Sequence, residues 1–346
     1  MSTPGPYALR RMIGGGQRIT LEPVDSLTIT TLVDNVYDVW MPDEGPAKRS
    51  GAGTTKGRLP VGTMVSGFVP DQLIAEHGFS LLLDVTRNGR SHRILFDTGV
   101  TPNGLIENMR RMEIDPKSIE AVVCSHGHFD HAAGLDGLAR TLGPSKLPVL
   151  IHPDFWNRRR AVFPGRDPIE MPTTSRRALE EVGFTIVEDR QPSFLLDQSV
   201  LITGEVARTS GYEPGFPVQQ AWRNDRWEPD PLVLDDQAVV MNLRNEGLVV
   251  ITGCGHAGIV NITRYARELT GEHKLCALVG GFHLQGPIFE PLIERVAADL
   301  HEMSPALVMP GHCTGWRAQY ALRKLFGQGM IPPCVGTRVR LGGEPF

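Results

Sequence analysis

The sequence predicts an α/β fold in which packed mixed β-sheets have helices on their outer faces. Three observations lead to this prediction. Apolar runs of strand length recur along the chain, helix-like segments lie between them in both halves, and no clear linker divides the chain. At 346 residues the length allows about two domains or one large one. We predict a single domain over residues 27–346, preceded by an N-terminal extension at 1–26.

The first third of the chain predicts a strand, a hairpin and a second buried strand. Alternating LTITTLVD predicts a strand at 27–34, and Asn88-Gly89 between two apolar runs is typical of a hairpin turn. Residues 41–72 are rich in Gly, Pro and charged residues and predict a long surface loop. The other elements expected here are strands at 80–85, 92–99 and 121–126 and a short helix at 102–113.

The rest of the chain alternates between helices and strands. We expect helices at 134–142, 174–182, 258–270, 287–303 and 316–326, and strands at 147–152, 184–189, 193–197, 200–205, 276–283 and 306–313. Residues 237–256 predict another hairpin, and 208–232 a second long loop.

Composition excludes several classes of protein. The 35 Lys and Arg against 39 Asp and Glu give a net charge of −4, which argues against a nucleic-acid partner. No apolar run approaches the ~18 residues of a membrane-spanning helix, and the N-terminus lacks the apolar stretch of a secretory signal. We therefore expect a cytoplasmic protein. The five cysteines, odd in number and without a CxxC pair, do not indicate a disulfide framework.

The strongest chemical signal is SHGHFDHAAGL at 125–135, where His126, His128, Asp130 and His131 fall within six positions. Neutral imidazole and carboxylate are ligands for zinc, manganese and iron. His126 and His128 point the same way if the strand is still extended there. Asp130 and His131 would come from the turn into the next helix and face a second metal position, roughly 3.5–4 Å from the first.

The H-x-H-x-D-H segment after a buried strand resembles the metallo-β-lactamase superfamily. LFDTG (95–99) and MPGHCTG (309–315) resemble its first and last motifs. The resemblance implies an αββα sandwich of two mixed β-sheets flanked by helices. It also implies that His312 is the final metal ligand and that Asp97 orients a ligand imidazole.

Further strings resemble one branch, named after the dihydropterin–ribofuranosylaminobenzene phosphate synthase of methanopterin biosynthesis. They are TLVDN (31–35), AEHGFS (75–80), TGEVAR (203–208), TGCGHAGIVN (252–261), GGFHL (280–284) and GHCTG (311–315). One fold hosts many reactions, so this resemblance does not by itself imply the activity.

The sequence departs from the superfamily at the motif TGD, whose aspartate bridges both metals. Here the chain reads TGCG at 252–255, which puts Cys254 at the bridging position and His256 two residues later. We expect His256 to be a ligand, and Cys254 to be either a ligand or a packed thiol. Glu205 at a strand end could supply the missing carboxylate or be a surface acid, and Asp34 could reach the metal rim.

His283 ends a predicted parallel strand, where ligand sites collect in open α/β sheets. We expect it to contact substrate or donate a proton, with a hydrogen-bonded core histidine as the alternative. Arg158 begins a basic run that would either clamp an anionic group or lie in a solvated loop. The remaining candidates for the substrate pocket are His77, His152 and Asn35.

The leading functional hypothesis is a metal-dependent hydrolase. Two divalent ions, with zinc favoured over manganese or iron, would generate a metal-bound hydroxide that attacks an ester, lactone or phosphoester of a small molecule, which could be anionic. Asp130 would orient the nucleophile and His283 would be the proton donor. One alternative is a dihydropterin diphosphate-dependent transferase, as the branch name implies. The other is a non-catalytic or mononuclear metal-binding or ligand-binding protein. The substrate, the metal and the oligomeric state stay open.

Overall fold

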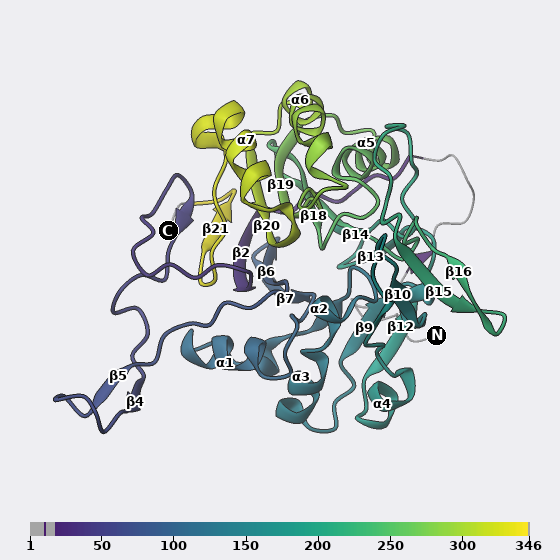
Figure 1. Cartoon of the computed structure of the whole chain (residues 1–346). Helices are drawn as coiled ribbons and strands as arrows, with labels where there is room; N and C mark the ends of the chain where they lie inside the picture. The colour runs from purple at the N-terminus through teal and green to yellow at the C-terminus, as the bar shows by residue number, and fades with distance from the viewer. Residues whose placement is uncertain (1–9, 12–17, 345–346) are drawn as a thin grey trace, which may run out of the picture.

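The computed structural model describes residues 10–11 and 18–344 and shows two large mixed sheets packed face to face, with helices outside each (Figure 1). This is the αββα arrangement that the sequence predicts. Part of the predicted N-terminal extension, 1–9 and 12–17, lies outside the described residues. No helix in the described ranges has the length and apolar character needed to cross a bilayer.

The first sheet has the order β12-β9-β8-β7-β6-β2-β21-β3. In that order its strands are Thr185–Glu188, Pro148–Ile151, Ala121–Val123, Arg90–Phe96, Ser80–Arg87, Ser26–Val33, Arg338–Leu341 and Ala47–Lys48. The hairpin of β6 and β7 turns at Asn88 and Gly89, which have φ of 50° and 73°, as a type I′ turn requires. Strands β7, β8, β9 and β12 run parallel, so their carboxyl ends lie at one edge.

The second sheet has the order β1-β13-β14-β17-β18-β19-β20. In that order its strands are Arg10–Arg11, Ser193–Leu195, Val200–Ile202, Val239–Leu243, Gly247–Thr252, Leu275–Gly281 and Leu307–Gly311. The predicted hairpin at 237–256 is β17 and β18, and β18, β19 and β20 run parallel.

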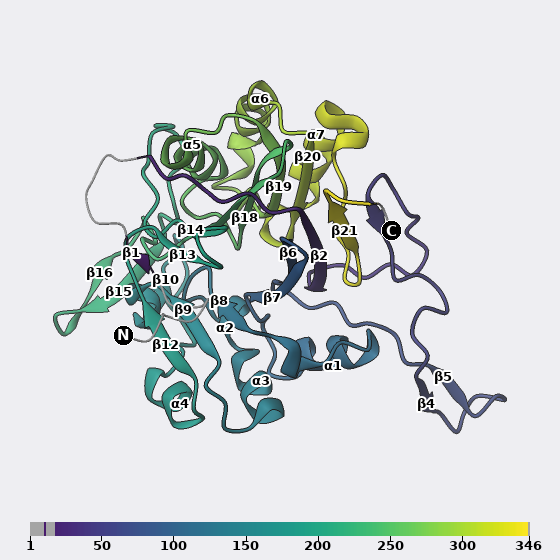
Figure 2. The same cartoon turned by 180° about the vertical axis from the view of Figure 1, so that it is seen from behind.

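Two smaller sheets form where the sequence predicts irregular structure. Within 41–72 lie β3 and a separate hairpin of β4 (Arg58–Pro60) and β5 (Phe68–Pro70), which projects away from the sandwich in both views (Figures 1 and 2). The other small sheet has the order β11-β10-β15-β16, with strands Ile169–Met171, Arg159–Ala161, Gln219–Arg223 and Arg226–Pro229. Its central pair, β10 and β15, joins residues about 60 positions apart, a pairing that local periodicity does not reveal.

Helices cover the outer face of each large sheet (Figure 1). The α-helices are α1 (Gly104–Arg111), α2 (Phe129–Ala132), α3 (Leu135–Leu142), α4 (Arg176–Glu181), α5 (Ile259–Thr270), α6 (Ile293–Met303) and α7 (Trp316–Phe326). The short 3₁₀ helices are Pro116–Ser118, Pro153–Trp156, Glu290–Leu292, His312–Thr314 and Gly327–Gly329. Helices α1, α3 and α4 lie on the first sheet, and α5, α6 and α7 on the second.

Alternating side chains of the strands build separate apolar layers. On β6, Leu81 and Leu83 face the other sheet, whereas Leu82 packs under the helices of its own sheet. On β18, Val249 enters the layer between the sheets and Val250 packs under α5. A strand that is covered on both faces has apolar side chains on both faces. The sequences of β6 and β18 are therefore continuous apolar runs rather than alternating apolar and polar residues.

Truncation in the layer between the sheets tests its contribution to stability. Leu83 is fully buried there, so we expect Leu83→Ala to lower the free energy of unfolding by about 2–5 kcal/mol through lost burial and a residual cavity. Val65, fully exposed at the tip of the projecting hairpin, is the control. Val65→Ala should change the free energy of unfolding by less than about 0.5 kcal/mol. Urea titration followed by circular dichroism measures both. Equal midpoints for the two variants would contradict this packing.

Candidate metal centre

The candidate site lies where strands from both large sheets end. His126 follows β8 by three residues, Cys254 follows β18 by two, and His312 directly follows β20. Each of these strands is parallel to a neighbour, so their carboxyl ends open toward one side. Such an edge is the usual position of ligand sites in α/β sheets, because the loops there can supply side chains from several strands.

The first group of side chains consists of His126, His128 and His256. All three are buried, and their ligand atoms lie within 4.8 Å of one another. Nδ1 of His128 is 3.2 Å from Nε2 of His256, and the rings of His126 and His128 are 4.5 Å apart. Three imidazoles from two distant segments therefore converge on one point.

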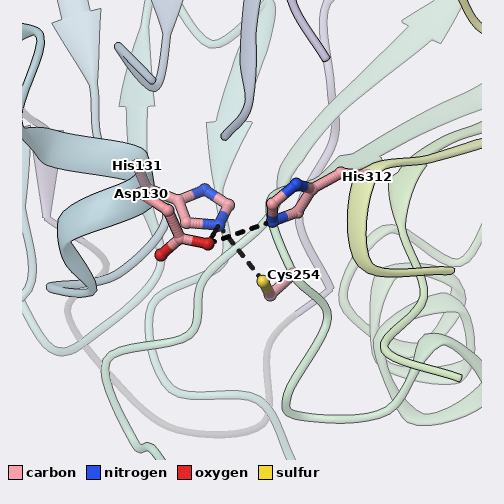
Figure 3. Close-up of side chains that lie close together, drawn as sticks. All are labelled: Asp130, His131, Cys254 and His312. Atoms are coloured by element: carbon pink, nitrogen blue, oxygen red, sulfur yellow. Dashed lines mark hydrogen bonds and ion pairs between the residues drawn. The ribbon is translucent and has the colours of Figure 1, made fainter. Parts of the chain in front are cut away.

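The second group consists of Asp130, His131, Cys254 and His312 (Figure 3). Oδ2 of Asp130 lies 3.3 Å from Nε2 of His312 and 3.8 Å from Nε2 of His131. The Cys254 sulfur is 3.1 Å from the same His131 nitrogen. Cys254 also lies within 4.8 Å of the ligand atoms of His256 and His283, so its thiol stands between the two groups.

Local backbone geometry brings these side chains together. After β8 the chain bends at Ser125 and Gly127 and is extended at His128, the N-cap of α2, and α2 then turns Asp130 and His131 inward. Gly127 packs so closely on the backbone of Phe155 that a Cβ would overlap its carbonyl oxygen. His283 and His312 have φ of 45° and 50°, a left-handed conformation that costs energy for a residue with a side chain and that clusters at functional sites.

The donor set fits divalent metal ions. Nε2 of His126 and Nδ1 of both His256 and His283 are buried without a hydrogen-bond partner, whereas buried polar atoms nearly always have one. Imidazole nitrogen, carboxylate oxygen and thiolate sulfur are all ligands of zinc and related ions. An ion at the first group would satisfy Nε2 of His126.

The electrostatics of the two groups differ. Burial and neighbouring imidazoles hold the pKa values of His126 and His256 well below the ordinary range, and burial together with Arg159 lowers the pKa of His128 to about 4. These rings are therefore neutral at pH 7 and can offer lone pairs. Burial opposes charge on His131 too, but the carboxylates of Asp130 and Asp97 outweigh it and raise its pKa to about 9.

Hydrogen bonds from outside each group orient the rings. Nδ1–H of His131 donates to Oδ2 of Asp97 at 2.7 Å, and Asp97 also accepts from the backbone N–H and the hydroxyl of Ser125. That hydroxyl accepts in turn from Nδ1 of His126 at 2.8 Å. One buried carboxylate thus positions a histidine of each group.

Asp34 and Asn35 lie behind His312. The Asn35 amide accepts from Nδ1 of His312 and donates to its backbone oxygen, both at 3.2 Å. Asp34 is buried and accepts from the His312 backbone N–H at 3.4 Å. Burial raises the pKa of Asp34 to about 6. The structure therefore places both residues in contact with His312, Asn35 at its ring and Asp34 at its backbone N–H.

The other candidate pocket residues divide between the site and its surroundings. His77 is two-thirds exposed, with Nε2 4.0 Å from Oδ2 of Asp130, so it lies at the rim. His152 and Glu205 bond to each other at 3.2 Å and, with Arg190, form a separate cluster. Arg158 is exposed and pairs with Glu170, which leaves it outside both groups.

Several buried polar residues beside the histidines carried no sequence signal. Ser125 and Asp235 contact the histidine segment directly, and Gln219 bonds to His128 at 2.6 Å. Gln219 lies in the segment 208–232 that the sequence predicts as a loop. A lone polar residue there gives no indication of burial until its strand is placed.

Comparisons with known proteins agree with this fold. The model of the metallo-beta-lactamase superfamily matches residues 75–268. The chain is 30% identical over 249 residues to the 7,8-dihydropterin-6-methyl-4-(beta-D-ribofuranosyl)-aminobenzene-5'-phosphate synthase of Methanocaldococcus jannaschii, covering 71% of this chain and 83% of that protein. It is 28% identical over 270 residues to an uncharacterized protein of the same organism, covering 77% and 95%.

Among solved structures, Tm1679, described as a metal-dependent hydrolase of the beta-lactamase superfamily, superposes with a TM-score of 0.68 at 25% identity. The match covers 92% of this chain and 100% of Tm1679. A four-layer αββα sandwich with a histidine-rich centre at its strand ends defines a metallo-β-lactamase-type protein. The chain belongs to the metallo-β-lactamase superfamily.

The Asp97 contact yields a test of the centre. Asp97→Asn keeps the side-chain volume but replaces one acceptor oxygen with a donor, so it cannot accept both the Ser125 backbone N–H, now bound at Oδ1, and the His131 ring and Ser125 hydroxyl, now bound at Oδ2. We expect zinc affinity, measured by competition with a chromophoric chelator, to fall about 10–100-fold. Asp84→Asn on the adjacent strand β6 is the matched control, since Asp84 pairs with Arg93 away from the site. Unchanged affinity in Asp97→Asn would contradict the positioning role.

Proposed function

We propose that this protein is a metal-dependent hydrolase of small molecules with an ester, lactone or phosphoester bond. The observation that carries the proposal is the convergence of seven metal-ligating side chains into two adjoining buried groups. Membership of a superfamily whose members are generally metal-dependent hydrolases supports it. The likeness to Tm1679, described as such a hydrolase, supports it as well.

In this proposal each group holds one divalent ion, with zinc favoured by the histidine and thiol donors. His126, His128 and His256 hold the first, and Asp130, His131 and His312 hold the second. The Cys254 thiol joins the second group, because its sulfur stands 3.1 Å from Nε2 of His131, at the place of the bridging aspartate. Burial raises the pKa of this thiol in the protein without metal, and a coordinating ion would reverse that shift.

Bound ions would supply Lewis acidity toward a carbonyl or phosphoryl oxygen and lower the pKa of a water. Asp130 orients the attacking group from the side of His312, which its carboxylate faces. His283 stands on the other side, its ring 4.2 Å from that of His256 and its Nδ1 without a hydrogen-bond partner. That nitrogen is therefore free to hold or donate a proton to a leaving group.

An apolar wall adjoins His283 and indicates how a substrate would be held. The ring of Phe289 lies 4.5 Å from the His283 ring, and the ring of Phe216 lies 5.4 Å from it. A pocket beside His256 and His283 is also lined by Phe282 and Leu284. These side chains would pack against an apolar or planar part of the substrate, while His77, at the rim beside Asp130, would contact its polar part.

A transfer reaction is the second candidate, favoured by the 30% identity to the dihydropterin-linked synthase of Methanocaldococcus jannaschii. The same ions would then stabilise a departing diphosphate, and an arylamine in place of water would attack. Incubation with a dihydropterin diphosphate and an arylamine phosphate decides between the two by product analysis. A coupled product would favour transfer, and free hydrolysis products alone would favour hydrolysis.

The number of ions per chain tests the ligand assignment. We expect elemental analysis of freshly purified protein to give about two ions per chain, and one fewer in His256→Ala. Cys254→Ser should weaken or lose the second ion, whereas Cys276→Ser, a buried thiol in the layer between the sheets, should keep both. One ion or none in the wild type would instead favour the mononuclear or binding-protein alternative.

Activity provides a separate test. His128→Ala removes a ligand of the first group, so hydrolysis in a screen of esters, lactones and phosphoesters should fall more than about 100-fold. His92 on β7, which pairs with Glu120 away from the site, is the control, and His92→Ala should retain wild-type activity. A His128→Ala variant that kept both its metal and its full activity would contradict the hydrolase proposal.

A further inference from the structure

We propose that Gln219, oriented by Asp230 and Arg159, is a positioning residue that fixes which ring nitrogen of His128 carries the proton. It does so from the small sheet of β10, β11, β15 and β16, outside the αββα sandwich. The inference rests on the proposed metal binding, because it concerns how His128 is prepared to be a ligand. It gives a role to the segment 208–232, which the sequence predicts only as a loop.

The first step is the contact between Gln219 and His128. Oε1 of Gln219 lies 2.6 Å from Nε2 of His128, and both side chains are buried. A carbonyl oxygen only accepts, so Nε2 must donate. A neutral imidazole has a single N–H, which leaves a lone pair on Nδ1. Nδ1 is the nitrogen that faces His256 at 3.2 Å, inside the first group.

The second step fixes the orientation of the Gln219 amide. Its Nε2 donates to Oδ2 of Asp230 at 2.9 Å and to the Asp230 backbone oxygen at 3.3 Å. Both atoms of Asp230 accept and neither donates. A flipped amide would therefore place its oxygen against two acceptors and its NH₂ against His128. The carboxylate of Asp230 thus decides that the oxygen of Gln219 faces the histidine.

The third step anchors Asp230 and the histidine segment together. Arg159 is only 2% exposed, and its Nε donates to Oδ2 of Asp230 at 3.3 Å. Its two terminal nitrogens donate to the two oxygens of Asp235 at 3.0 and 2.5 Å. Asp235 in turn accepts the backbone N–H of Gly127 at 2.8 Å, directly beside His128. The Arg159 guanidinium therefore holds the ring of His128 through Asp230 and Gln219. It holds the backbone beside His128 through Asp235 and Gly127.

Charge in this network is balanced, which permits its burial. Arg159 and Arg223 face Asp230 and Asp235, and Arg223 donates to Oδ1 of Asp230 at 3.0 Å. Buried charges are tolerated when they are paired and hydrogen-bonded. Asp230 and Asp235 keep their orientation because each of their oxygens has a donor.

Imidazole ¹⁵N NMR of the metal-free protein tests the inference directly, since the two neutral tautomers have different nitrogen shifts. The wild type should show His128 with its proton on Nε2 only. Gln219→Met removes the acceptor at similar size and should give the other tautomer or a mixture, with zinc affinity about 10–100-fold weaker in chelator competition. Gln220→Met is the matched control, because this neighbour on β15 pairs with Arg160 on the small sheet. It should match the wild type in both measurements.

Asp230→Asn tests the orienting step with Gln219 in place, and it provides an answer if Gln219→Met does not fold. An asparagine can present a donor or an acceptor, so the Gln219 amide should populate both orientations and His128 both tautomers. A wild-type proton on Nδ1, or an unchanged tautomer and zinc affinity in both variants, would overturn the inference while leaving the hydrolase proposal intact. The expected tautomers in a wild-type chain that binds no divalent metal ion would support the positioning step and contradict the proposed function.

Discussion

The face-to-face packing of the two large sheets is the constraint on which the site depends. Leu83 and Val123 of the first sheet and Val249 and Val279 of the second meet in one buried layer. This packing holds β8 of the first sheet and β18 of the second so that the residues after them converge. Without it, His126 and His256 would belong to separate surfaces, although they are 4.8 Å apart ring to ring in the folded protein.

The same packing creates an unfavourable concentration of buried polar groups. Five imidazoles, a carboxylate and a thiol lie together at the two groups, and some of their nitrogen atoms have no hydrogen-bond partner. Burial without a partner costs roughly 1–3 kcal/mol for each such group. Divalent ions would relieve this cost, so metal binding and the stability of this edge are expected to be coupled.

Four histidine rings of the candidate centre share a common arrangement. His126, His128, His131 and His312 each have one nitrogen bonded to a partner outside the group, and the partners are Ser125, Gln219, Asp97 and Asn35. These partners come from different elements: Gln219 from the small sheet, Asn35 from the end of β2 and Asp97 from the end of β7. Ring orientation therefore depends on parts of the fold that supply no ligand, which is how a rigid centre is usually maintained.

The sequence by itself determined the packed mixed sheets with helices outside them and the histidine cluster. Long apolar runs and the local spacing of His126, His128, Asp130 and His131 are both visible in short windows. It could not reveal β21, the β10–β15 pairing, or the roles of Gln219, Arg159 and Asp235, because these depend on contacts between distant segments. It also could not separate His283, which adjoins the site, from His152, which bonds to Glu205 in another cluster, because both end predicted strands. Only the tertiary structure decided which strand ends meet, because sheet order is fixed by long-range packing rather than by local pattern.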